Sequence, residues 1–224
     1  MLDSVGLLFR TFDDDRCEFL GTCFAYRSSS RFITAAHCLE GVPCENLKIM
    51  PFHNHILHNV HDYEIHPEAD FAIIRMDMFL AVHEFNPFVD CLAVNGLGMD
   101  FAAFGFPEDS MGPNKGQSTP RLFKGHIQSV MHYHSSSFPQ YKYEASELNI
   151  ACPRGLSGGP IFSVYEPQKV IGVVTENLEA STIIFEEEKH SSGEHVYYQK
   201  YVEYGVAVLL DPIKDWLNEK IPNA

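Results

Sequence analysis

The stretch Cys152-Pro153-Arg154-Gly155-Leu156-Ser157-Gly158-Gly159-Pro160 decides how the rest of this 224-residue chain is interpreted. Its serine stands among glycines, which adopt backbone angles that side chains forbid and let another chain approach closely. One interpretation is a glycine-rich turn between two strands. The other is a nucleophile on a sharp turn, with the N–H groups of Gly155 and Ser157 aimed at a substrate carbonyl oxygen. Donors pre-set for a developing oxyanion are a powerful device in acyl transfer.

A serine hydroxyl needs a base within hydrogen-bond reach, because it is a weak nucleophile at neutral pH. The candidate base is His37, which follows the apolar and small residues Phe32-Ile33-Thr34-Ala35-Ala36. A third group must fix the tautomer of that imidazole and stabilise its charged form. Asp70 suits this role, since it opens the apolar run Phe71-Ala72-Ile73-Ile74 and would place its carboxylate at the edge of a buried strand.

These motifs resemble those of the chymotrypsin-like (trypsin-like) serine peptidases. The matching stretches, in the family's order, are Thr34–Cys38, Asp70–Ile74, Gly155–Pro160 and Gly172–Thr175. The resemblance implies two antiparallel six-stranded β-barrels with a C-terminal helix, and an active site in the cleft between the barrels. It also implies that Ser157 attacks the scissile carbonyl, His37 carries the proton and Asp70 orients His37, while Gly155 and Ser157 hold the oxyanion.

The resemblance also assigns residues that would touch a substrate. The strand Val174–Asn177, which includes Thr175, would pair with an extended peptide. A specificity pocket would have Ala151 at its floor and Arg154 at its mouth, with walls from Cys152, Asn177, Gly205 and Ala207. Ala151 has no charge to select Arg or Lys, and Val174 stands where relatives that cleave after Glu place a histidine. We therefore expect an open apolar pocket and cleavage after uncharged side chains of medium to large size, such as Leu, Met, Phe or Tyr.

Activation is expected to differ from that of secreted relatives. Those are cut to release an N-terminal ammonium, which pairs with an aspartate just before the catalytic serine. Leu156 holds that position here, and no basic residue followed by Ile-Val-Gly-Gly lies near the start of the chain. The sequence therefore predicts activity without N-terminal processing, controlled by a protein partner, a ligand or substrate access.

The composition narrows the function classes. A net charge of −14 would repel nucleic acid and anionic membranes, so the expected partner is a protein or peptide substrate. The longest apolar runs, such as Val206–Leu210, are far shorter than the ~20 residues of a membrane helix. The N-terminus lacks the basic start and apolar core of a signal peptide. These features predict a cytoplasmic chain.

Cysteines and histidines leave alternatives open. The six cysteines are interpreted as free thiols that behave as small hydrophobes, while the family resemblance leaves a Cys23–Cys38 disulfide as the alternative. A run of histidines is spaced irregularly and lacks organised carboxylate or cysteine partners, so an exposed hairpin and loop is favoured over a metal site. These histidines are His53, His55, His58, His61 and His66. No cofactor is expected.

Short strand-like runs bounded by Gly, Pro, Ser and Asn indicate an all-β architecture. The predicted strands are Val5–Phe12, Phe19–Arg27, Arg31–Ala35, Leu47–Phe52, Asp70–Met76, Asp100–Phe106, Leu122–His134, Tyr141–Ile150, Pro160–Tyr165, Val170–Thr175 and Tyr201–Leu210. The Gly- and Pro-rich residues 111–120 are predicted to link an N-terminal barrel of residues 1–110 to a C-terminal barrel of residues 121–224.

Three further segments carry specific expectations. Ser135–Ser137 should form a polar loop near the substrate entrance, by family analogy. Residues 177–200 should form a projecting hairpin with a solvated acidic tip. Asp211 should cap a C-terminal helix that starts at Pro212 and buries Trp216 and Leu217.

Two other functions are compatible with the same motifs. An esterase or acyl transferase would use the same three residues, but the peptide-pairing strand argues against it. A binding module would keep the protease shape and hold a protein partner without cleaving it. Reaction with a fluorophosphonate separates these classes, because only an activated serine reacts.

Overall fold

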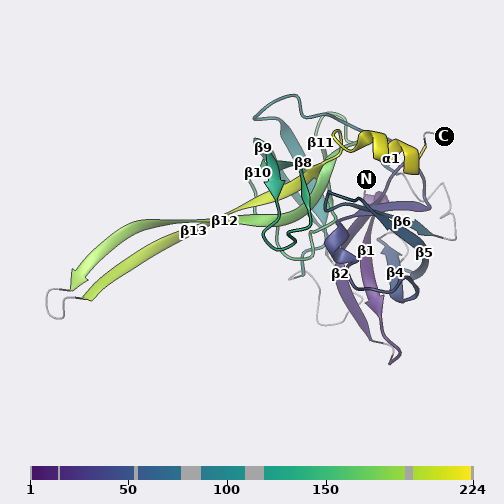
Figure 1. The fold of residues 1–224 in the computed structure, drawn as a ribbon, viewed down its shortest axis with the longest axis horizontal. Helices are drawn as coiled ribbons and strands as arrows, with labels where there is room; N and C mark the ends of the chain where they lie inside the picture. Colours follow the sequence, from purple (N-terminus) through teal and green to yellow (C-terminus); the bar gives the residue numbers. More distant parts are fainter. Residues whose placement is uncertain are drawn as a thin grey trace.

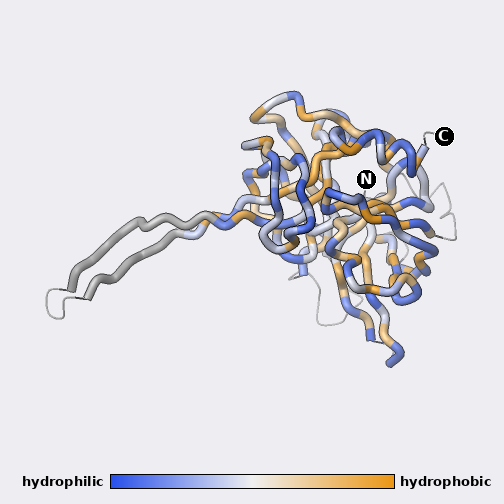
Figure 2. Tube along the Cα trace, viewed as in Figure 1, coloured by the Kyte–Doolittle hydropathy of each residue, from blue (hydrophilic) through white to orange (hydrophobic). Residues whose placement is uncertain are grey.

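The computed structural model describes residues 2–14, 16–52, 55–76, 87–108, 119–189 and 194–222. Its strands form two sheets, and the α-helix α1 (Lys214–Lys220) lies at the C-terminal end (Figure 1). Along the strands of the body, apolar positions interchange with polar ones, as expected for sheets with one face in a core (Figure 2). This arrangement confirms the predicted all-β class with a C-terminal helix.

The first sheet is a closed antiparallel barrel. Its strands follow the order β1-β2-β3-β6-β5-β4 around the ring. Their bounds are β1 (Val5–Thr11), β2 (Cys17–Ala25), β3 (Arg31–Thr34), β4 (Leu47–Pro51), β5 (His58–Ile65) and β6 (Ala72–Met76). Large apolar side chains fill the interior, and several are fully buried: Leu7, Phe24, Phe32, Ile33 and Ile49. Closure of the ring pairs both edges of each of these six described strands.

Strand β5 corrects one prediction. The histidine-rich segment that was expected to be an exposed hairpin and loop contributes residues 58–65 to the barrel, between β4 and β6. Val60 is buried while His61 is exposed, so neighbouring residues of this strand face the core and the solvent. The strand was not predicted because its composition is typical of a loop. His53 lies outside the described residues. In the described part of the chain, no group of three or more His, Cys, Asp or Glu side chains is arranged to hold a metal ion.

The second sheet has seven strands in the order β11-β8-β9-β10-β13-β12-β7. A further pairing of β11 with β12 joins six of these strands into a ring, which is the second predicted barrel. The two-residue strand β7 pairs in parallel with the start of β12. The bounds are β7 (Asp90–Cys91), β8 (Asp100–Gly105), β9 (Arg121–His134), β10 (Lys142–Leu148), β11 (Pro160–Ser163), β12 (Lys169–Lys189) and β13 (Glu194–Leu209).

The chain changes sheets earlier than the sequence suggested. Strand β8 precedes the predicted linker at 111–120, yet it is hydrogen-bonded to β9 and β11 within the second sheet. The predicted linker therefore falls between two strands of one sheet, and most of it (111–118) lies outside the described residues. A Gly- and Pro-rich composition marks a turn, and it does so within a sheet as well as between domains.

A long two-stranded ribbon projects from the second sheet, as predicted (Figure 1). The predicted strand Val170–Thr175 and the hairpin that follows are one continuous strand, β12, which pairs with β13 out to Lys189 and Glu194. The register shifts between Val174 and Glu176 and again between Ile183 and Phe185, which marks two β-bulges in β12.

Helix α1 returns from the second half of the chain to the first barrel. Its first residue is Lys214, because residues 211–213 form a turn in which Lys214 N–H donates to the Asp211 carbonyl (3.2 Å). Asp211 therefore does not cap the helix with its side chain. As predicted, Leu217 is buried, while Trp216 is half-buried against Phe71 (ring centroids 6.0 Å apart). No helix in the described ranges is long and apolar enough to cross a membrane.

Thr22 of β2 joins the two sheets. Its N–H donates to the Ser157 carbonyl and its hydroxyl to the Gly155 carbonyl, both at 2.8 Å. The same hydroxyl accepts the N–H of Phe106 (3.1 Å), and the Thr22 carbonyl accepts the Thr34 hydroxyl (2.8 Å). Every polar group of this fully buried residue is therefore paired, and both ends of the Gly155–Ser157 turn are fixed to the first barrel.

Gly158 lets the sheets approach at this point. Its φ is +84°, and an added Cβ would lie 2.0 Å from the Thr22 carbonyl oxygen and 2.2 Å from the Thr34 hydroxyl oxygen. Gly41 has a similar φ of +69° but faces open space, with nothing within 4 Å of an added Cβ. The two glycines therefore differ in packing and share their backbone conformation.

We expect Gly158→Ala to destabilise the fold much more than Gly41→Ala. Both changes place a side chain in the left-handed region, at about 1–2 kcal/mol. Only Gly158→Ala adds an overlap between the two sheets, so its loss in free energy of unfolding should be larger by at least about 2 kcal/mol. Urea unfolding of both variants measures this, and equal losses would contradict the packing described for Gly158.

Candidate active site

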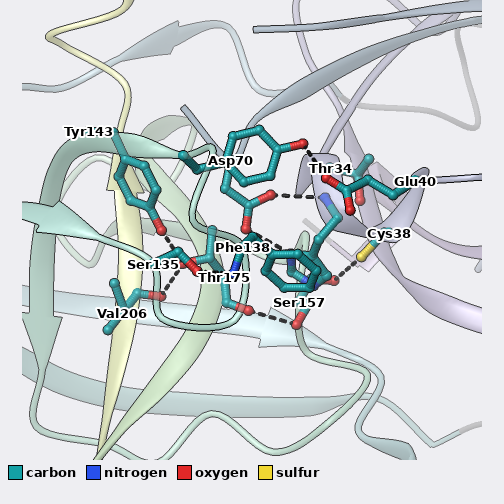
Figure 3. A network of polar contacts seen from close by, with 12 residues as sticks. Thr34, Cys38, Glu40, Asp70, Ser135, Phe138, Tyr143, Ser157, Thr175 and Val206 are labelled. Carbon is teal, nitrogen blue, oxygen red and sulfur yellow. Dashed lines mark hydrogen bonds and ion pairs between the residues drawn. The ribbon is translucent and has the colours of Figure 1, made fainter. Parts of the chain in front are cut away.

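Three turns carry the predicted catalytic residues, and two of these residues, Asp70 and Ser157, belong to the network of polar contacts in Figure 3. His37 lies in the 3-10 turn η2 (Ala36–Cys38), which follows β3. Asp70 lies in the turn just before β6, and Ser157 lies in the turn before β11. The first barrel thus supplies the imidazole and the carboxylate, while the second sheet supplies the hydroxyl.

Asp70 holds His37 through two hydrogen bonds. Its Oδ2 lies 2.7 Å from Nδ1 of the imidazole, and its Oδ1 accepts the His37 main-chain N–H at 2.9 Å. Asp70 is fully buried, and these two hydrogen bonds give each of its carboxylate oxygens a partner within the protein. Because an ionised carboxylate only accepts, Nδ1 carries a proton and Nε2 is the nitrogen left to act as a base.

The surroundings of His37 favour its protonated form. Burial of the ring opposes protonation, but Cys38 and Asp70 favour the charged ring, and the balance raises the pKa of His37 well above its ordinary value. The Asp70 carboxylate is the partner that is charged at neutral pH, because a thiol is mostly neutral there. Asp70 therefore stabilises an imidazolium at this place.

Phe138 covers one face of the imidazole, a contact that the sequence did not reveal. The two rings are stacked, with centroids 4.9 Å apart and an angle of 14° between their planes. Phe138 follows directly after the serine run that was predicted to lie near the substrate entrance. Its main-chain N–H donates to the hydroxyl of the buried Ser135 (2.9 Å), which fixes the β9–β10 loop in this position.

The β9–β10 loop is attached to the first barrel beside His37. The Glu40 carboxylate accepts hydrogen bonds from the Tyr141 hydroxyl (2.8 Å) and from the Gln140 amide (2.5 Å). The main-chain N–H of Lys142 donates to the Glu68 carbonyl (2.7 Å). The loop thus crosses from the second sheet to both turns that carry His37 and Asp70, and it restricts the imidazole between a carboxylate and an aromatic ring.

The Ser157 hydroxyl donates to the Thr175 carbonyl at 2.9 Å (Figure 3). Among the described residues, the Ser157 hydroxyl makes no other hydrogen bond and therefore none to His37. Thr175 is the extra residue of the first β12 bulge, and its own hydroxyl is anchored to the Val206 carbonyl and near the Tyr143 hydroxyl, both at 3.2 Å. The bulge thus turns a strand carbonyl toward the serine.

The peptide planes around Ser157 set the direction of two N–H groups. Glu108 N–H donates to the Arg154 carbonyl (2.7 Å), and Gly159 N–H donates to the Leu156 carbonyl (2.8 Å). Because a trans peptide points its N–H opposite its carbonyl, the N–H groups of Gly155 and Ser157 face the other way. Neither donates to an acceptor in the described ranges. Gly155 has a φ of +88°, which permits this turn.

The residue before the serine is an apolar anchor. Leu156 is fully buried in the apolar core of the second sheet, and its N–H donates to the Pro153 carbonyl (3.0 Å). The turn is therefore held by backbone hydrogen bonds and an apolar side chain, with no buried charge that would require an ammonium partner.

The predicted specificity pocket is partly filled. The Asn177 amide accepts the Cys152 N–H (2.7 Å) and donates to the Cys152 carbonyl (2.9 Å), so it joins β12 to the Ala151–Pro153 segment. An added Cβ at Gly205 would lie 2.3 Å from the Cys152 sulfur, which therefore occupies the space above that glycine. The space beside Gly205, which the sequence predicted to be open, is therefore filled by this sulfur.

The other predicted substrate contacts lie in different surroundings. Ala151 is exposed, and the Arg154 side chain is 93% exposed with the Glu108 carboxylate 3.9 Å away. Val174 and Ala207 stand opposite each other and are fully buried in the core of the second sheet. Neither side chain is therefore exposed to contact a substrate, although the sequence had predicted such contact for both residues.

All six cysteines are free thiols, so no Cys23–Cys38 disulfide is formed in the structure. Burial raises the pKa of the Cys152 thiol to about 12. Since the thiolate is the reactive form, Cys152 is not a competing nucleophile near Ser157.

Comparison with known proteins supports the fold and leaves the activity to be tested. No protein-family model and no curated protein sequence matches the chain. The Rv3671c protease from M. tuberculosis in its active form superimposes with a TM-score of 0.65 at 16% identity, over 95% of this chain and 78% of that one. The fold is that of chymotrypsin-like serine proteases.

Two further structures agree with this. The MamO protease domain from Magnetospirillum magneticum superimposes with a TM-score of 0.64 at 13% identity, over 95% of both chains. The HtrA-type protease AlgW, solved with a decapeptide, gives a TM-score of 0.63 at 14% identity, over 99% of this chain and 66% of that one. HtrA-type proteases are thus among the chymotrypsin-like structures that share this arrangement of two sheets.

The raised pKa of His37 predicts the pH dependence of any reaction in which it acts as a base. A base must be neutral, so activity should be full above the pKa of His37 and should be lost as the pH falls through it. The midpoint of kcat/KM against pH should therefore lie above about 6.5, the ordinary value for histidine. NMR titration of the imidazole in the Ser157→Ala variant gives the same pKa without turnover. A midpoint at or below 6.5 in both measurements would contradict the assigned role of Asp70.

Proposed function

We propose that the chain is a serine endopeptidase that acts through Ser157, His37 and Asp70. Ser157 attacks the scissile carbonyl and forms an acyl-enzyme, with His37 taking its proton and then giving it to the leaving amine. Asp70 orients His37 and stabilises the imidazolium, while the N–H groups of Gly155 and Ser157 hold the oxyanion. The observation that supports the proposal is the hydrogen-bonded pair of His37 and the buried Asp70, together with a serine turn that has two N–H groups without an acceptor in the described ranges.

Substrate binding would complete the site. An extended peptide lies antiparallel to Thr175–Asn177, and the residue with the scissile carbonyl donates its N–H to the Thr175 carbonyl. That carbonyl now accepts the Ser157 hydroxyl, so the arriving N–H competes with the serine for it. Once displaced, the hydroxyl is free to donate to Nε2 of His37 and become the nucleophile.

The proposed cleavage site follows an uncharged apolar residue. Ala151 places no charge at the floor of the pocket, and an unpaired charge would be costly to desolvate there. The Cys152 sulfur above Gly205 shortens the pocket, which favours a side chain of the size of Ala, Val, Leu or Met over Phe or Tyr. Discrimination among these should be shallow, because one methylene is worth about 1–3 kcal/mol.

The proposal includes activity without N-terminal processing. The serine turn is held by Thr22, by the main-chain N–H of Glu108 and by the buried Leu156 side chain, and all three groups are neutral. Formation of the oxyanion site therefore needs no ammonium from a newly cut N-terminus.

A protein-binding module is the second candidate. One observation favours it: the Ser157 hydroxyl is directed to the Thr175 carbonyl and not to His37. In that case the chain would hold an extended partner on β12 without cleaving it.

A peptide library incubated with the intact, untrimmed chain tests the proposed function. We expect cleavage mainly after Ala, Val, Leu and Met, little after Arg, Lys, Asp or Glu, and a loss of about 10⁶-fold in Ser157→Ala. Asp70→Asn should lose about 10⁴-fold, because the imidazole takes the wrong tautomer. A profile dominated by Arg or Lys would refute the pocket assignment, and an inert intact chain would favour the binding module.

A further inference from the structure

The strand proposed to pair with substrate continues beyond the cleft. β12 runs unbroken from Lys169 to Lys189. Its inner part is covered on one edge, since β11 pairs with it up to Val173 and Val174 exchanges hydrogen bonds with Gly158 and Gly159 (2.8 and 2.9 Å). Past Val174, its strand partner within the described ranges is β13. The edge opposite β13 therefore extends from the cleft along the projecting ribbon (Figure 1).

The hydrogen-bond pattern shows which backbone groups face this edge. Asn177 stands directly opposite Gly205, and the Gly205 N–H donates to Ile150 on the other side of β13 (2.6 Å). The two residues are therefore a non-hydrogen-bonded pair, so the N–H and C=O of Asn177 point away from β13. Because the direction alternates along a strand, the next residues with outward N–H and C=O groups are Glu179 and Ser181.

We propose that this edge binds the part of the substrate upstream of the cleaved bond, as a third strand of the ribbon. The inference rests on the proposed peptidase function and adds the class of substrate. If the residue with the scissile carbonyl is counted as the first, the third upstream residue pairs with Asn177. The fifth then pairs with Glu179 and the seventh with Ser181. Such a substrate is an extended or unfolded polypeptide, because the bound segment must be free of sheet partners of its own.

Continuity with the cleft favours this occupant. A free strand edge is a template for pairing with any other chain, so a second copy of this protein, ribbon against ribbon, is the alternative. A peptide lying along Thr175–Asn177 already points antiparallel to β12 and reaches Glu179 without a turn. Main-chain pairing would supply affinity over many sequences, while the pocket near Cys152 would set the cleaved residue.

The inference is tested by measuring how tightly peptides of different length, and with N-methyl groups at different positions, bind to the intact Ser157→Ala chain. One peptide carries three residues upstream of the scissile position and a second carries eight, and both share the same cleavage site. The longer peptide should bind about 10-fold or more tightly. N-methylation at its fifth and seventh residues should remove this gain, because those N–H groups face β12, whereas N-methylation at the fourth and sixth should leave it. Equal effects at odd and even positions would overturn the inference.

A shortened ribbon provides the second test. Residues 181–201 are replaced by Asn-Gly, which joins the directly opposed Ala180 and Val202 through a two-residue hairpin turn. The gain from upstream length should fall, and binding of the short peptide should stay unchanged. If this variant fails to fold, the N-methyl series on the intact chain still decides the inference.

The two proposals fail in different ways. Position-dependent binding of the long peptide without cleavage by the unsubstituted chain would refute the peptidase function and keep the ribbon edge as a binding site. Equal cleavage of short and long peptides by the unsubstituted chain would refute the ribbon edge and keep the peptidase. Self-association that the shortened ribbon abolishes, with no effect of peptide length, would assign the edge to a second copy and overturn the inference.

Discussion

The pairing of Thr22 with the serine turn is the interaction on which the arrangement of the site depends. One buried residue of the first barrel binds the carbonyls at both ends of Gly155–Ser157, while its hydroxyl also accepts the Phe106 N–H. Leaving either carbonyl unpaired in this buried place would cost about 1–3 kcal/mol. The absence of a side chain at Gly158 brings the two sheets close enough for these bonds to form. The same contact that joins the two halves therefore also fixes the turn that carries the N–H groups of Gly155 and Ser157.

Around His37, a loop of the second sheet packs against residues of the first barrel. The first barrel contributes His37 and Asp70, and the second sheet sends the β9–β10 loop across to them. Phe138 stacks on the imidazole and the Glu40 carboxylate holds the loop in place. Each half therefore completes a part of the site that lies on the other half. A relative movement of the sheets would disturb the imidazole and the serine turn together, which couples the integrity of the fold to the geometry of the site.

Sequence patterns anticipated the features that depend on local chemistry. The glycine spacing around Ser157, the small residues before His37 and the apolar run after Asp70 are each visible within a few positions. Contacts made over long separations in sequence were not predictable: nothing near Phe138 indicates a partner 101 residues upstream, and nothing near Thr22 indicates a bond to Ser157. The strand β5 was not predicted because its polar residues have the composition of a loop. The position of the Cys152 sulfur beside Gly205 was not predicted either, because small residues at 205 and 207 do not indicate which side chain fills the space next to them.

If Ser157 is an activated nucleophile, it reacts with a fluorophosphonate. The intact chain is treated above the pKa of His37, and the modified residue is located by mass spectrometry. We expect a single stoichiometric adduct on Ser157 that is lost in the His37→Ala variant, because the hydroxyl reacts only with a base beside it. Absence of an adduct on Ser157, or an adduct that forms equally without His37, would contradict the activation of Ser157.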